Sequence, residues 1–266
     1  MQELTNIPIT NIWKFPDGEI HIELSEIDRK KSLSLTIAIT SADDLFVFMQ
    51  IADVLKRQCI NVSSLTITYL MGMRCDRLFD FNRPFTLGIV ADVINSLGAK
   101  KVILIEPHSE RSLNLIHNSQ PLYMSYFIAT QLQAENDNIC FVAPDEGSIY
   151  RYVNVPFSVI CSKVRDAQTG ELKEFSVQAK SDVKGRDLLV VDDLCDGGGT
   201  FCGLAPKLRE LEPKTLSLAV THAVQLDGIK RVASVYDNVY ITDSYKKWGE
   251  EELPSNVTVF TSFKTL

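Results

Sequence analysis

The sequence has none of the features by which membrane proteins and proteins with broad nucleic-acid surfaces are usually found. No apolar run reaches the length of a membrane span, and the first residues form no basic-then-apolar signal peptide. Lysine and arginine number 27 against 34 acidic residues, so the net charge of −7 disfavours an extended anionic partner. We therefore expect a cytoplasmic protein that binds neither nucleic acid nor membranes and holds any anion at a local site.

Cys-x-x-Cys pairs are also absent, which disfavours a metal cluster. The six cysteines are Cys59, Cys75, Cys140, Cys161, Cys195 and Cys202. Cys59, Cys140 and Cys161 lie in or beside apolar patterns. The sequence therefore predicts reduced and mostly buried thiols.

The chain is long enough for two domains, because 266 residues with 45% hydrophobic content can bury two modest cores. Ser41 and Asp44 form a capping-box pattern at the start of an amphipathic helix. Short apolar runs predict strands at residues 20–24, 33–40, 64–70, 101–109, 138–143, 157–161, 187–191, 215–221, 239–242 and 257–261. Helical patterns lie at residues 42–57, before 97, near 120–135 and at 200–211.

Residues 187–200 are the most informative stretch. A P-loop is absent, and acids stand where a dinucleotide fingerprint needs glycines. Asp192 and Asp193 follow a buried strand and precede three glycines and Thr200, where the next helix begins. Glycines let the backbone present N–H groups to a phosphate, while carboxylates suit the hydroxyls of a sugar. The order predicts a sugar-phosphate site at the carboxyl edge of a sheet, with an ordinary acidic turn as the alternative.

Arginines gather in a second segment, residues 71–84, between a buried strand and a helix. Arg74, Arg77 and Arg83 offer bidentate donors for phosphates and faces that stack on a base. His108 ends a later strand, where an isolated histidine is more often structural than functional.

Lys163 and Arg165 alternate along a strand and so point the same way. The polar residues that follow, with Thr-Gly at the tip, predict an exposed, mobile hairpin. A transition-state clamp and a solvated charged hairpin are equally compatible with this pattern alone.

A family resemblance links these segments. Residues 191–200 resemble the ribose-5-phosphate loop shared by type I phosphoribosyltransferases and PRPP synthetases (ribose-phosphate diphosphokinases). Arg74, Asp76 and Arg77 match the Arg-Gln-Asp-Arg/Lys loop of PRPP synthetases, with Cys75 in place of glutamine.

Other PRPP synthetase motifs follow in family order. Glu106-Pro107-His108 is similar to the Asp-x-His motif, and Asp145 stands in a Pro-Asp-x-Gly element. Lys163 and Arg165 match a mobile Lys-x-Arg pair. An N-terminal Phe-x-Asp/Asn-x-Glu segment is matched by Phe15, Asp17 and Glu19.

The resemblance implies an α/β fold of two type I phosphoribosyltransferase-like domains, each a mainly parallel sheet flanked by helices. Residues 1–120 would form the ATP side and residues 121–266 the ribose-5-phosphate side. The ATP site would comprise Phe15, Asp17, Glu19, Arg74, Asp76, Arg77 and His108. The ribose-phosphate site would comprise Asp192, Asp193, Asp196, Gly197, Gly198, Gly199 and Thr200. His108 and Asp145 would hold Mg²⁺, a cation that suits this donor set.

The implied reaction transfers diphosphate from MgATP to the C1 hydroxyl of the sugar and releases AMP, with Lys163 and Arg165 stabilising the moving group. The resemblance also implies a homo-oligomer, at least a dimer. The chain lacks the family's N-terminal strand-helix segment, so its usual hexamer and allosteric site are not implied.

Gly197 stands where the family loop has threonine. We therefore hypothesise an acceptor with a substituent on its 5-phosphate, such as ADP-ribose, in nucleotide or NAD precursor synthesis. The alternatives are a PRPP-dependent phosphoribosyltransferase and a catalytically silent regulatory homologue.

Overall fold

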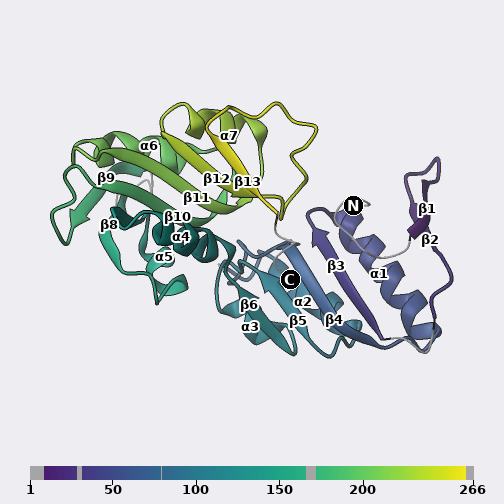
Figure 1. Ribbon diagram of the computed structural model, residues 1–266. Coiled ribbons are helices and arrows are strands. Elements are labelled where there is room, and N and C mark those ends of the chain that lie inside the picture. Colours follow the sequence, from purple (N-terminus) through teal and green to yellow (C-terminus); the bar gives the residue numbers. More distant parts are fainter. Residues whose placement is uncertain (1–8, 29–31, 79, 166–171, 262–266) are drawn as a thin grey trace. The chain divides into compact units, whose positions relative to one another are not determined.

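A computed structural model describes residues 9–28, 32–78, 80–165 and 172–261 of the protein (Figure 1). The side chains of residues 163–165, 172 and 173 lie outside this description. The chain forms two compact units, and each is described by itself. The first unit comprises Met1–Leu122 with Ser244–Lys247, and the second comprises Tyr123–Asp243 with Trp248–Leu266.

The first unit is built on a parallel sheet with strand order β3-β4-β5-β6. Its strands are β3 (Leu33–Ile39), β4 (Val62–Leu70), β5 (Val102–Ile105) and β6 (Ser119–Leu122). Its helices are α1 (Ala42–Arg57), α2 (Thr86–Ser96) and α3 (Arg111–Leu115). A separate antiparallel hairpin pairs β1 (Ile9–Lys14) with β2 (Ile20–Leu24).

Helix α1 begins at the predicted capping box. Ser41 Oγ accepts from the Asp44 N–H at 3.1 Å, and Asp44 Oδ2 accepts from the Ser41 N–H at 3.1 Å. Both bonds satisfy N–H groups that a helix start leaves without partners. The helix then buries Val47, Phe48 and Ile51 at helical spacing.

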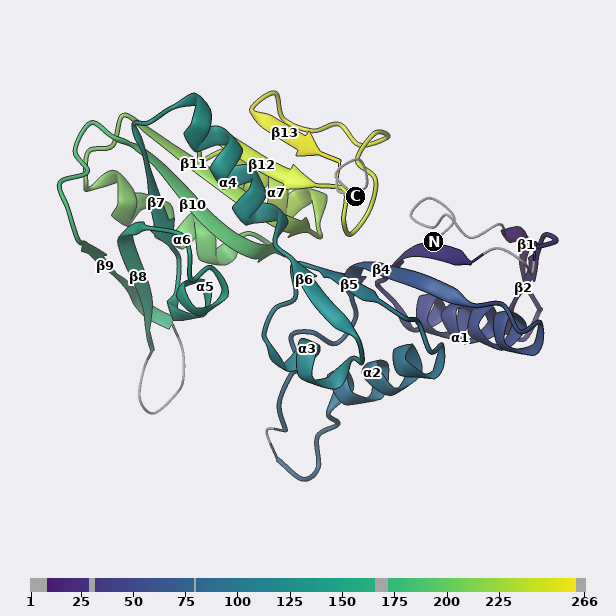
Figure 2. The same cartoon turned by 60° about the horizontal axis from the view of Figure 1, so that its bottom comes forward.

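The second unit contains a seven-stranded sheet in the order β13-β12-β11-β10-β7-β8-β9. All neighbours are parallel except β8 and β9, which form a hairpin at the sheet edge (Figure 2). The strands are β7 (Ile139–Ala143), β8 (Phe157–Arg165), β9 (Leu172–Ala179), β10 (Asp187–Cys195), β11 (Thr215–Ala223), β12 (Asn238–Thr242) and β13 (Val257–Phe260). The helices are α4 (Met124–Glu135), α5 (Glu146–Arg151), α6 (Gly199–Arg209) and α7 (Leu226–Ala233).

Strand β10 is buried on both faces because helices cover both sides of its sheet (Figure 1). Leu188 and Val190 belong to the core cluster that contains residues of α6 and α7. Leu189 and Val191 belong to the cluster that contains residues of α4. Successive side chains of a strand point to opposite faces, so an unbroken apolar run fits a sheet covered on both sides.

Several elements were not predicted as separate helices or strands, among them β1, α3, β9 and α7, and two further differences have a clear local cause. The helical pattern near residues 120–135 contains β6 before α4 starts at Met124. Pro121 disfavours a strand in the sequence, because proline has no backbone N–H to donate to a neighbouring strand. The structure accommodates it because β6 is an edge strand. Helix α5 was not predicted at all, since its six residues are too few to show a helical period.

The prediction of mostly buried thiols is wrong for half of the cysteines. All six are free, but Cys59 and Cys75 are exposed and Cys202 is half-buried. Cys59 follows the end of α1 with a φ of 57°, so its backbone turns away from the apolar pattern that precedes it. Cys140, Cys161 and Cys195 are buried as expected.

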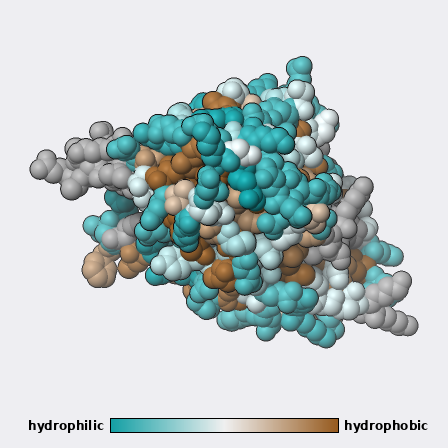
Figure 3. Space-filling view, turned by 60° about the vertical axis from the view of Figure 1, so that its left-hand side comes forward, coloured by the Kyte–Doolittle hydropathy of each residue, from teal (hydrophilic) through white to brown (hydrophobic). Residues whose placement is uncertain are grey.

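Hydrophilic residues cover most of the face shown in Figure 3, with hydrophobic residues scattered among them. Within the described residues, every helix is too short or too polar to cross a membrane.

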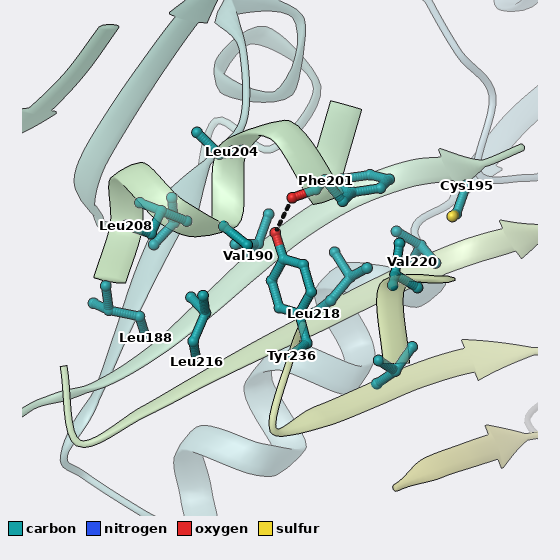
Figure 4. Packing of buried hydrophobic residues seen from close by; sticks show 14 of the residues in the cluster. Leu188, Val190, Cys195, Phe201, Leu204, Leu208, Leu216, Leu218, Val220 and Tyr236 are labelled. Carbon is teal, nitrogen blue, oxygen red and sulfur yellow. Dashed lines mark hydrogen bonds between the residues drawn. The ribbon is translucent and has the colours of Figure 1, made fainter. Parts of the chain in front are cut away.

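Tyr236 joins α6 to the core of the second unit (Figure 4). Its buried hydroxyl donates to the Phe201 carbonyl at 3.1 Å, and its ring packs among Leu218 and other core residues. We expect Tyr236→Phe to lower the free energy of unfolding by about 1 kcal/mol, because only a hydrogen bond is lost. Tyr236→Ala should cost about 3–5 kcal/mol, because it also leaves a cavity. Urea unfolding of both variants measures these changes. Equal losses of unfolding free energy in the two variants would contradict the separate contributions of the hydrogen bond and the ring.

Candidate functional site

Asp145 and Asp192 lie at the carboxyl ends of β7 and β10 in the second unit, where Ser148 contacts both. Asp145 follows β7 and caps α5, accepting from the Ser148 N–H at 3.2 Å. Ser148 Oγ lies 3.3 Å from Asp145 Oδ1 and 3.0 Å from Asp192 Oδ1. A single hydroxyl proton can serve only one of these acids at a time, so Ser148 links their hydrogen bonding.

Arg151 supplies the positive charge that compensates the adjacent carboxylates Asp192 and Asp193, which together form the acid pair. Its Nη1 lies 3.0 Å from Asp192 Oδ1 and 3.2 Å from Asp193 Oδ1, and its side chain is only 6% exposed. Two adjacent carboxylates without a cation could not stay buried and charged. Arg151 was missed in the sequence, although the burial of the acid pair was a signal that a cation had to come from elsewhere in the chain.

The acid pair is electrostatically strained. Burial and the neighbouring charge of Asp193 raise the pKa of Asp192 to about 7, and the charge of Arg151 opposes this rise. The Asp193 N–H also donates to Asp192 Oδ1 at 3.0 Å and favours its charged form. Burial and repulsion from Asp193 therefore favour the protonated form of Asp192.

The glycine loop after β10 depends on close backbone packing against α7. Gly198 has a φ of 75°, and a Cβ there would lie 2.8 Å from the Gly228 carbonyl oxygen. A Cβ on Gly228 would lie 2.0 Å from the Asp196 carbonyl oxygen. Neither position can accept a larger side chain without moving the loop. Gly228 was not predicted, because nothing in its local sequence shows that α7 touches the loop.

The side chains of Gln225, which directly precedes α7, and of Arg231 on α7 also hold the loop. Gln225 donates to Asp196 Oδ1 at 2.7 Å, and Arg231 Nη1 donates to the Gly197 carbonyl at 2.9 Å. Gly199 and Thr200 open α6, with Gly199 exposed. The structure thus brings the predicted ribose-phosphate residues together on one strand end, one turn and one helix start, a place suited to an anion.

The arginine loop of the first unit packs on the segment that follows β5. Asp76 is only 5% exposed, and it accepts from Arg77 Nε at 3.3 Å. Arg111, which was not predicted, donates to the Asp76 carbonyl at 3.3 Å. Burial favours the neutral acid, but the Ser109 hydroxyl, the hydrogen bond and charge of Arg77 and the charge of His108 together outweigh it and lower the pKa of Asp76. Asp76, Arg77 and His108 therefore share one electrostatic environment.

Arg74 is exposed on the same loop. Glu106 is fully buried and has a φ of 46°, which is rare for a residue with a side chain. This backbone conformation turns the chain between β5 and His108.

Phe15, Asp17 and Glu19 form the tight turn of the β1–β2 hairpin. The Phe15 N–H donates to the Glu19 carbonyl at 2.8 Å, and Asp17 Oδ1 accepts from the Glu19 N–H at 3.0 Å. Phe15 is 43% exposed and meets the His21 ring edge-on at 5.0 Å. The turn presents an aromatic and acidic surface to solvent.

Lys163 and Arg165 lie on β8, where their backbones pair with Phe175 and Leu172 of β9. The strand therefore extends further than predicted, and the hairpin exists. The register shifts between Val164 and Arg165. The predicted tip at residues 166–170 and both side chains lie outside the described residues.

The predicted magnesium ligands lie in different units, His108 in the first and Asp145 in the second. The described residues contain no group of three or more metal-ligating side chains. Mg²⁺ usually keeps waters and takes one or two protein ligands together with substrate phosphates, so a carboxylate and an imidazole fit its chemistry. The metal assignment stays a prediction.

We expect Arg151→Met to lower the free energy of unfolding by about 3–5 kcal/mol at pH 8, because two buried carboxylates lose their cation. The folded pKa of Asp192 lies above its unfolded value, so this group stabilises the folded state less as the pH rises towards about 7. The loss in Arg151→Met should therefore shrink at pH 5.5, where Asp192 takes up a proton. Urea unfolding at both pH values measures it.

Arg209→Met is the matched control. Arg209 forms a half-exposed pair with Asp237 at 3.0 Å. Its removal should cost about 1 kcal/mol or less, with little change between the two pH values. A loss in Arg151→Met that is equally small, or that grows at pH 5.5, would contradict the charge-compensation account.

Comparison with known proteins identifies the family of the chain. The sequence model of the phosphoribosyl transferase domain matches residues 123–255. Ribose-phosphate pyrophosphokinase from Marinomonas sp. (strain MWYL1) is 28% identical over 256 residues, which cover 90% of this chain and 79% of that protein. The enzyme of the same name from Ralstonia nicotianae (strain ATCC BAA-1114 / GMI1000) is 29% identical over 255 residues, with the same coverage of 90% and 79%.

A solved structure shows the same fold. Phosphoribosylpyrophosphate synthetase from Mycobacterium smegmatis superposes with a TM-score of 0.76 at 21% identity, covering 96% of this chain and 86% of that one. The predicted α/β fold of two type I phosphoribosyltransferase-like domains is confirmed. With half of its residues matched by the domain model and relatives aligned along most of its length, the chain belongs to the phosphoribosyl transferase domain family and, within it, to the ribose-phosphate pyrophosphokinases (PRPP synthetases).

Proposed function

We propose that this protein transfers the β,γ-diphosphoryl group of MgATP to the C1 hydroxyl of ribose 5-phosphate or of a larger acceptor that contains it, and releases AMP. The observation that carries this proposal is the acid pair Asp192–Asp193, held by Arg151 beside a glycine loop. This arrangement joins acceptors for sugar hydroxyls to donors for a phosphate.

The sugar binds to the second unit in this proposal. Asp192 and Asp193 accept hydrogen bonds from ribose hydroxyls, and their buried position orients them before the ligand arrives. The loop from Asp196 to Thr200 binds the 5-phosphate through backbone N–H groups and the Thr200 hydroxyl. These assignments come from the residue types and the family motif together.

The nucleotide binds to residues of the first unit. Arg74 and Arg77 contact the triphosphate, while Phe15, Asp17 and Glu19 contribute to an adenine pocket, across the interface of a homo-oligomer of at least two subunits. His108 and Asp145 would hold Mg²⁺, which when bound neutralises charge on the phosphates and orients them.

The reaction exchanges one phosphorus–oxygen bond for another. The C1 oxygen bonds to the β-phosphorus and loses its proton, the bond from that phosphorus to the bridging oxygen of the α-phosphate breaks, and AMP leaves. Such transfer depends on positioning and charge neutralisation. Lys163 and Arg165 stabilise the moving diphosphate from β8.

The acceptor is a ribose whose 5-phosphate carries a substituent, such as ADP-ribose, which would place the reaction in NAD metabolism. Gly197 supports this proposal, because a Cβ at this position would meet nothing within 4 Å. The glycine thus leaves open space at the phosphate end of the loop, where the family pattern has a branched side chain.

We expect Lys163→Ala to lower turnover by about 100- to 1,000-fold, because a donor to the transition state is lost. AMP release from MgATP measures this. Lys180→Ala, which removes the same charge from an exposed position after β9, serves as the control and should leave turnover within about twofold. Unchanged turnover in Lys163→Ala would overturn its catalytic role.

Acceptor identity is tested by AMP release with ribose 5-phosphate and ADP-ribose in parallel, with the products resolved by mass. We expect a diphosphate adduct of ADP-ribose, and we expect Gly197→Thr to reduce its formation relative to that of PRPP by roughly tenfold, since a modest steric conflict in a binding pocket has this size. Gly249→Thr is a control in equally open space.

Exclusive use of ribose 5-phosphate would reject the larger acceptor and leave the diphosphokinase reaction standing. Absence of AMP with both acceptors, together with binding of PRPP, would favour the phosphoribosyltransferase or the silent homologue.

A further inference from the structure

Arg231 on α7 reaches the glycine loop at its most open position. Its Nη1 donates to the Gly197 carbonyl at 2.9 Å. Gly197 has open space where a side chain would stand, since a Cβ there would meet nothing within 4 Å. The guanidinium group and this open space therefore adjoin the same residue of the phosphate-binding loop.

Within the part of the chain that the structure describes, Arg231 forms no ion pair, whereas Arg151 and Arg209 both face carboxylates. A guanidinium carries five N–H donors, and the Gly197 carbonyl occupies one of them. The exposed remainder of this fork has the geometry to bind a phosphate group.

A purely structural role does not require this charge. The loop is already held by the Gln225 amide on Asp196, by the Val224 N–H on the Cys195 carbonyl at 3.0 Å, and by contact with Gly228. A neutral donor would serve the Gly197 carbonyl equally well. Arg231 forms no ion pair with the residues that the structure describes and lies beside the proposed phosphate loop, so a phosphate of the ligand is a suitable partner for its charge.

The contact that Arg231 makes also distinguishes its position from the binding position proposed for the 5-phosphate of ribose. The 5-phosphate of ribose is assigned to the backbone N–H groups of the loop from Asp196 to Thr200, whereas Arg231 contacts a carbonyl oxygen of that loop, the one of Gly197. An anion at Arg231 would thus be a second group, next to the 5-phosphate.

We propose that Arg231 binds a second phosphate, joined to the 5-phosphate of the acceptor, and so selects ligands of the nucleoside diphosphate ribose class over ribose 5-phosphate. This inference rests on the proposed function for the location of the sugar site. It names a specificity residue, and Arg231 is assigned no part in the phosphoryl transfer.

Binding without ATP tests this inference independently of catalysis. Calorimetry with ADP-ribose and with ribose 5-phosphate compares the wild type, Arg231→Gln, Arg231→Lys and the control Lys230→Gln, which removes one exposed charge from the same helix. We expect Arg231→Gln to lose roughly tenfold to hundredfold more affinity for ADP-ribose than for ribose 5-phosphate, the range for a lost charged hydrogen bond. Arg231→Lys should restore part of this difference, and Lys230→Gln should match the wild type.

Equal loss for both ligands in Arg231→Gln would overturn the inference and leave Arg231 as a support of the loop. Stronger binding of ribose 5-phosphate than of ADP-ribose by the wild type would overturn it as well. Failure of the proposed function looks different, because a protein that binds ADP-ribose through Arg231 but releases no AMP would retain the subsite and lose the diphosphokinase assignment.

Discussion

The structure of the second unit depends on how two adjacent carboxylates are kept buried at the end of β10. Asp192 and Asp193 are 8% and 3% exposed, and one guanidinium serves both. Their burial prepares them to receive hydroxyl groups without reorganisation, and it also makes Arg151 indispensable, because a buried charge without a partner costs several kcal/mol. Stability and the proposed recognition of the sugar therefore depend on the same ion cluster.

The glycine loop shows a related coupling between packing and recognition. A loop that offers its N–H groups to a phosphate must lie close to its support without side chains in the way. The contact of Gly198 with Gly228 achieves this, since neither residue has room for a Cβ. The polar contacts from Gln225 and Arg231 then hold the loop from its open side. Helix α7 thus belongs to the site, although it lies 30 residues further along the chain than the loop it supports.

Two features set this chain apart from the family pattern, and both lie in segments that we propose bind the substrates. Cys75 replaces a glutamine in the arginine loop, and it is exposed beside Arg74 and the buried Asp76. Gly197 replaces a threonine in the phosphate loop and leaves open space next to Arg231.

Most strands and the order of the motifs could be predicted, because apolar runs, glycine turns and the capping box at Ser41 are local patterns. Elements that are short or contain a disfavoured residue could not be predicted. Strand β6 contains a proline, and α5 is too short to show a helical period. The acids and glycines of the site were visible for the same reason as the strands, since they stand together in one stretch.

The sequence by itself determined which residues are candidates for the sugar-phosphate site and in which order they occur. Only the tertiary structure decided what holds them. Arg151 precedes Asp192 by 41 residues and meets it because β7 and β10 are neighbours in the sheet. Gly228 and Arg231 reach the loop only after α7 has packed beside it. Such contacts depend on which strands pair and on which face each helix packs, and these are properties of the whole sheet, which no single segment encodes.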